Sequence, residues 1–64
     1  MFTLYESTAS GHRAIETFPT FDEAVTGAHG LFKTVYYEED ADYPGCADFF
    51  AENGSIYCIE PARV

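Results

Sequence analysis

Apolar and polar residues alternate with a period of two at the start of the chain. Residues 2–7 show this alternation clearly, and residues 12–18 continue it in a similar style after the polar segment 8–11. A period of two is typical of a strand that buries one face, because successive side chains point to opposite sides of a sheet. The pattern therefore predicts two strands joined by a short polar loop.

A period of three to four residues replaces this alternation after Pro19. Thr20 can accept a hydrogen bond from the Glu23 amide while the Glu23 side chain reaches back to the Thr20 amide, which forms a capping box. The apolar residues that follow fall on one stripe of a helix: Phe21, Ala24, Val25, Ala28, Leu31, Phe32, Val35 and Tyr36. This stripe predicts a helix over about 20–37.

Gly27 and Gly30 weaken the predicted helix, since each costs about 1 kcal/mol relative to Ala in a helix interior. Both lie off the apolar stripe, so we expect neither to be needed for packing onto a sheet. An alternative ends the helix at Gly30 and makes residues 31–38 a strand. We favour the continuous helix, because the apolar residues after Gly30 keep the phase of those before it.

A hairpin is predicted at Asn53-Gly54, because both residues accept the positive φ of a tight turn between two β-rich runs. With a two-residue loop, Phe49 pairs with Cys58, and Cys46 and Cys58 lie on opposite faces of the sheet. With a three-residue loop and a bulge, the two cysteines share a face. The sequence leaves this register open.

The assembled order is ββαββ, an α+β fold formed by one domain over residues 1–64. Its simplest arrangement is a four-stranded antiparallel sheet with the helix packed on one face. The other face would then display Phe50, Tyr57 and Ile59. Such an apolar patch either binds a partner or is covered by the termini or by the loop over residues 37–45.

Composition and charge narrow the class of partner. The chain has 64 residues, of which 47% are hydrophobic and 17% aromatic, so it is apolar enough to fold despite a net charge of −8. Residues 34–62 contain seven acids and neither Lys nor Arg. Because phosphate groups and anionic lipids need cations to bind them, this surface disfavours nucleic acid and membrane as direct partners. A basic protein surface or a cation is the expected partner.

The sequence shows neither a signal peptide nor a transmembrane segment. The N-terminus lacks the basic and apolar regions of a signal peptide, and no apolar run reaches transmembrane length. We therefore expect a cytoplasmic protein, located in the bacterial host cell if its gene is carried by a phage. Cys46 and Cys58 are expected to be free thiols.

The sequence matches no motif of catalytic or metal-binding residues. Residues 40–51 begin like a calcium-binding loop, but Pro44 and Ala51 occupy two of its ligand positions. His12 and His29 have no second ligand at the spacing of a metal motif, and the two cysteines form no Cys-x-x-Cys pair. We expect no enzymatic activity, no metal site and no cofactor.

Small size, strong acidity and aromatic residues among carboxylates resemble the phage-encoded DNA mimics that block restriction enzymes or CRISPR effector complexes. In that class, carboxylates take the place of phosphates in a basic channel. The resemblance implies a binding site formed by six acids and two tyrosines: Glu38, Glu39, Asp40, Asp42, Asp48, Glu52, Tyr37 and Tyr43.

The leading hypothesis is therefore a non-catalytic acidic inhibitor, a monomer or homodimer, that occupies a basic surface of a larger nucleic-acid-binding protein. The alternative is a small bacterial structural or interaction domain that self-associates through its exposed sheet face.

Overall fold

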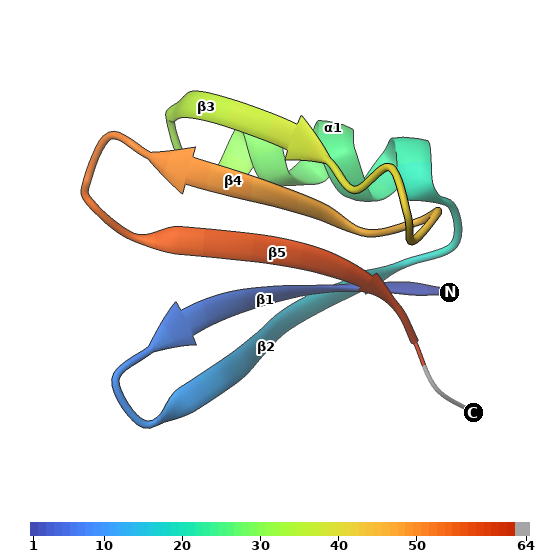
Figure 1. The fold of residues 1–64 in the computed structure, drawn as a ribbon, viewed down its shortest axis with the longest axis horizontal. Coiled ribbons are helices and arrows are strands. Elements are labelled where there is room, and N and C mark those ends of the chain that lie inside the picture. Colours follow the sequence, from blue (N-terminus) through green and yellow to red (C-terminus); the bar gives the residue numbers. More distant parts are fainter. Residues whose placement is uncertain (63–64) are drawn as a thin grey trace.

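The fold is a five-stranded antiparallel sheet with one helix on one face (Figure 1). We describe residues 1–62 of a computed structural model. The elements are β1 (Phe2–Thr8), β2 (Gly11–Phe18), α1 (Phe21–Leu31), β3 (Thr34–Glu39), β4 (Ala47–Ala51) and β5 (Ile56–Pro61). Across the sheet the strands follow the order β2-β1-β5-β4-β3. The predicted α+β class is confirmed, whereas the prediction of four strands is wrong by one.

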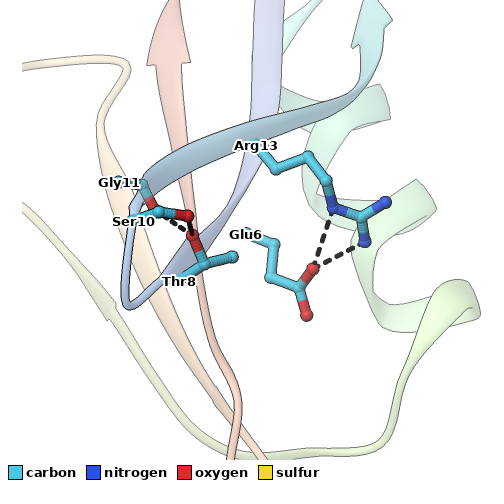
Figure 2. A network of polar contacts seen from close by, with 5 residues as sticks. All are labelled: Glu6, Thr8, Ser10, Gly11 and Arg13. Atoms are coloured by element: carbon cyan, nitrogen blue, oxygen red, sulfur yellow. Dashed lines mark hydrogen bonds and ion pairs between the residues drawn. The ribbon is translucent and has the colours of Figure 1, made fainter.

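The hairpin predicted at the N-terminus forms between β1 and β2. At its turn, the Thr8 hydroxyl donates to the Gly11 carbonyl at 2.7 Å, and Arg13 donates from Nε and Nη2 to one Glu6 oxygen at 3.2 and 2.6 Å (Figure 2). Ile15 has no partner in the ladder, so β2 bulges there. These local bonds keep an almost fully exposed edge strand paired with β1.

Helix α1 begins where the sequence predicts. The Glu23 amide donates to the Thr20 hydroxyl at 3.1 Å, which is the first half of the capping box. Ala24 and Ala28 are fully buried against the sheet. Both side chains are small, so the helix can approach the sheet closely. The larger side chains of the strands then fill the space between the helix and the sheet.

The core lies between α1 and the sheet. Its buried residues are Leu4, Ala24, Ala28, Ala47, Phe49, Ala51, Tyr57 and Ile59. Phe32 stacks on Tyr57 with ring centroids 3.9 Å apart and meets Phe49 edge to face at 5.7 Å. The residue that follows the helix is therefore part of the aromatic core.

The helix ends at Leu31, so the predicted helix over 20–37 is too long and the alternative with a strand after Gly30 is nearly right. Phe32 is already extended, and the Glu52 amide donates to the Lys33 carbonyl at 2.8 Å. The β-branched and aromatic residues of β3 then pair with β4, starting with Thr34 opposite Ala51. Backbone pairing with a neighbouring strand outweighs the helical phase of these residues.

The C-terminal hairpin adopts the three-residue loop. The Gly54 amide donates to the Ala51 carbonyl at 3.0 Å, the Ala51 amide donates to the Ser55 carbonyl at 2.9 Å, and Gly54 has a φ of +89°. Phe49 consequently pairs with Tyr57 rather than with Cys58.

This register reverses the faces expected for β5. Tyr57 and Ile59 are buried beneath the helix, which corrects the expectation that they are displayed on the uncovered face. Phe50 does lie on that face and is 40% exposed. Cys46 and Cys58 share this face as free thiols, as the three-residue loop requires.

The expectation that neither helical glycine is needed for packing onto the sheet is wrong for Gly27. A Cβ atom at this position would lie 2.5 Å from Cε1 of Phe18, at the end of β2, whereas a Cβ atom at Gly30 would meet nothing within 4 Å.

The two helical glycines give a matched prediction. Gly30→Ala should raise the free energy of unfolding by about 0.5–1 kcal/mol, because Ala favours the helix and has space there. Gly27→Ala should lower it by up to about 2 kcal/mol, because the cost of displacing the Phe18 ring exceeds the same gain in helix propensity. Urea denaturation of both variants measures the difference, and equal stabilisation would contradict the packing described.

Candidate functional site

The sheet face opposite α1, called the open face below, carries the candidate site. The strand registers arrange its side chains in three rows that run from β3 to β2. The first row is Tyr36, Phe50, Ile56, Ser7 and His12, and the second is Glu38, Asp48, Cys58, Tyr5 and Ala14. The third row begins at Asp40, which lies just after the end of β3. It then contains Cys46, Glu60, Thr3 and Thr17.

Four carboxylates gather on one half of the open face. Glu38 lies directly opposite Asp48 across β3 and β4. Asp40 lies at the end of β3, where its amide donates to the Cys46 carbonyl at 3.0 Å, and Glu60 extends the group onto β5. Like charges directly opposite each other on neighbouring strands destabilise a sheet. This half of the face therefore retains an arrangement that is unfavourable for folding.

The cations of the described residues do not neutralise this group. Arg13 bonds Glu6 on the helix side of the sheet, and Lys33 Nζ lies 3.2 Å from the Glu52 carboxylate at the opposite end of β4. Within residues 1–62, no Lys or Arg lies on the open face.

Aromatic and aliphatic side chains border the carboxylates. Tyr36, Phe50 and Ile56 are 52%, 40% and 41% exposed, and the first two rings meet edge to face at 5.6 Å. The Tyr36 hydroxyl donates to Glu38 at 2.7 Å, which orients that carboxylate and raises the pKa of Tyr36. With these exposed fractions, no segment within residues 1–62 covers this row, so the apolar patch is open to solvent in the described part of the chain.

A hollow of about 330 Å³ lies among these groups and is lined by both cysteines, His12, Asp40, Asp48 and Glu60 together with four less polar residues. Burial raises the pKa of Cys58 to about 11, with further contributions from Glu60 and Asp48. Burial and the same acidic neighbours also raise the pKa of Cys46. Protonated thiols are poor nucleophiles, so both pKa shifts disfavour thiolate chemistry in this hollow.

The structure divides the eight residues that the sequence analysis placed in one site. Glu38, Asp40 and Asp48 lie on the open face. The remaining five lie elsewhere: Asp42 and Tyr43 in the loop after β3, Glu39 and Tyr37 on the helix side of β3, and Glu52 in the hairpin turn beside Lys33. The residues of the predicted site therefore lie in four places rather than one.

Tyr37 departs furthest from its expected position. Its ring packs on Phe49 at 4.9 Å and on His29 at 5.8 Å, and its buried hydroxyl has no hydrogen-bond partner among the described residues. Burial, with a contribution from nearby Glu39, raises the pKa of Tyr37 to about 12. Tyr37 therefore packs against the core on the helix side of the sheet and is not part of the open face.

Three polar residues of the open face were missed at the sequence level. His12, Cys58 and Glu60 come from β2 and β5, and their ligand atoms all lie within 4.8 Å of one another. The alternation of β5 would have placed Cys58 and Glu60 on the open face only if the hairpin had been assigned a three-residue loop. The sequence left the length of that loop open.

A second hollow, of about 500 Å³, lies beside the start of α1 between Phe18 and Thr26. Its charged side chains, Asp22 and Glu23, already stabilise the positive end of the helix dipole. We therefore assign no separate function to it.

Comparisons with protein-family models, with curated proteins and with solved structures found no match to this chain. No helix in the described part of the chain is long and apolar enough to span a membrane.

Replacement of Tyr37 by Phe should raise the free energy of unfolding by about 1 kcal/mol, because it removes a buried hydroxyl that lacks a partner. The gain should grow as the pH rises from 10 towards 12, since Tyr37 ionises readily in the unfolded chain and resists ionisation in the folded one.

Thermal unfolding at several pH values measures both effects. Tyr43→Phe is the control, because Tyr43 is 66% exposed and its hydroxyl should contribute less than about 0.5 kcal/mol. Destabilisation by Tyr37→Phe would indicate that the buried hydroxyl has a partner after all.

Proposed function

We propose that the protein is a non-catalytic binding protein whose open face engages a basic surface of a larger protein in place of nucleic acid. The observation that carries the proposal is the group formed by Glu38, Asp40, Asp48 and Glu60 on an uncovered sheet face. A nucleic-acid-binding channel, such as that of a CRISPR effector, is the kind of surface that such a group suits. Occupation of that channel would make the protein an inhibitor.

Electrostatic repulsion within the open face supports this proposal. A domain of this size has only a few kcal/mol of stability, so opposed carboxylates such as Glu38 and Asp48 are a substantial disadvantage when nothing binds them. A basic partner would supply the missing countercharges and turn this repulsion into attraction on binding.

The neighbouring aromatic row would contribute contact area. Tyr36 and Phe50 already hold each other in place, so little side-chain entropy would be lost when a partner covers them. Aromatic residues are also enriched at the centres of protein interfaces. Carboxylates and aromatic rings on one rigid sheet give a surface suited to protein binding.

Charge reversal on the two faces of the sheet tests this proposal. Immobilised wild-type protein is used to capture proteins from a lysate of the cell in which it is made, and duplex DNA and salt are then used as competitors. We expect bound proteins to be released by both competitors. The variant Glu38→Lys/Asp48→Lys should weaken capture of the same proteins at least about tenfold.

A matched control changes the net charge equally on the helix side of the sheet. Glu16→Lys/Glu39→Lys should retain capture, because both side chains point away from the open face. Equal loss of binding in both double variants would contradict the open face as the site. Capture that is insensitive to salt and to duplex DNA would contradict nucleic-acid mimicry itself.

Self-association through the open face is a second candidate, which the exposure of Phe50 and Ile56 favours. In a symmetric dimer, however, the four carboxylates of one copy would oppose those of the other. Sedimentation at increasing salt tests this candidate. A dimer formed through this face should tighten with salt, because salt screens that repulsion, whereas a monomer at all salt and protein concentrations would exclude it.

A further inference from the structure

We propose that His12, Cys58 and Glu60 form a zinc-binding site in the hollow of the open face. This inference does not depend on the proposed function, because it concerns a different ligand and can be tested on the isolated protein. It rests on one imidazole, one thiol and one carboxylate that two strands bring together from distant parts of the chain.

The ligand atoms are close to the spacing that zinc requires. The imidazole nitrogen of His12, Sγ of Cys58 and a carboxylate oxygen of Glu60 all lie within 4.8 Å of one another. Tetrahedral zinc has bonds of about 2.0–2.3 Å, so its ligands are about 3.3–3.8 Å apart. His12 and Glu60 are exposed and Cys58 is half-buried, so rotation of the two exposed side chains can close the remaining gap.

The ligand set is also selective in its chemistry. Imidazole and thiolate are ligands that zinc favours, whereas calcium and magnesium favour sites formed only by oxygen atoms. On binding, the metal takes the place of the Cys58 thiol proton, which passes to solvent. Three protein ligands leave a fourth position open for water or for a group of a partner molecule.

The surroundings of the three ligands favour a cation. Asp40 and Asp48 line the same hollow, so a divalent ion would enter a region of strongly negative potential. Ile56 and Ile59 form part of the wall, which lowers the local dielectric constant and strengthens that attraction.

Cobalt substitution gives the most direct test. The protein is reduced with a phosphine, freed of metal and titrated with Co²⁺ in the presence of excess Mg²⁺. We expect a thiolate-to-cobalt charge-transfer band in the near ultraviolet with one equivalent of metal, and its loss when Zn²⁺ is added. Affinity for Zn²⁺ is then measured by competition with a chelating dye.

Matched variants assign the ligands. Cys58→Ser should remove the charge-transfer band, while Cys46→Ser, which changes the other thiol of the same hollow, should retain it. His12→Gln and Glu60→Gln should each weaken zinc binding at least about tenfold. His29→Gln should leave zinc affinity unchanged, because His29 packs on the helix side against Phe49.

Circular dichroism of each variant checks that the fold is retained, so that a loss of binding can be attributed to a lost ligand. The proposal would be overturned by the absence of a charge-transfer band in the folded wild-type protein, by displacement of Co²⁺ by Mg²⁺, or by equal effects of His12→Gln and His29→Gln. None of these results would alter the capture of a basic partner, so the two proposals can fail separately.

Discussion

A single glycine in the left-handed conformation constrains most of this structure. Gly54 closes a three-residue turn after β4 and thereby sets the register of β4 against β5. Because side chains alternate along a strand, a shift of one residue would exchange the two faces of β5. The observed register places Tyr57 and Ile59 beneath the helix and Cys58 on the open face beside Asp48. The hydrophobic core and the candidate site are therefore two consequences of the same turn.

The short helix determines how much of the sheet is left uncovered. Ala24 and Ala28 bring the helix close to the sheet, and the chain then leaves the helix at Leu31 and returns as edge strand β3. One helix can cover only one face of the sheet, so the opposite face remains in contact with solvent. As the edge strand of the sheet, β3 adds Tyr36 and Glu38 to the open face. Tyr36 extends the aromatic row, and Glu38 extends the acidic group.

The open face shows how electrostatics and stability oppose each other in a small domain. Glu38 and Asp48 repel each other across two strands, and Asp40 and Glu60 add to the same field. The hydrogen bond from Tyr36 to Glu38 offsets part of this cost. Both proposals supply positive charge to this surface, one from the basic side chains of a partner protein and the other from a zinc ion held by His12, Cys58 and Glu60. Each proposed ligand would thus stabilise the folded chain by relieving repulsion within it.

The sequence by itself determined the elements that depend on local signals. The alternation of residues 2–18 predicted the first hairpin, Thr20 predicted the start of the helix, and Asn53-Gly54 predicted a turn. It also determined the acidity of the C-terminal half. The end of the helix was not determined, because the apolar residues of 31–36 fit both the helical phase and a strand, and pairing with β4 decided between them. The composition of the site likewise depended on tertiary structure, since one additional residue in a loop decides which side chains of β5 join His12 on the open face.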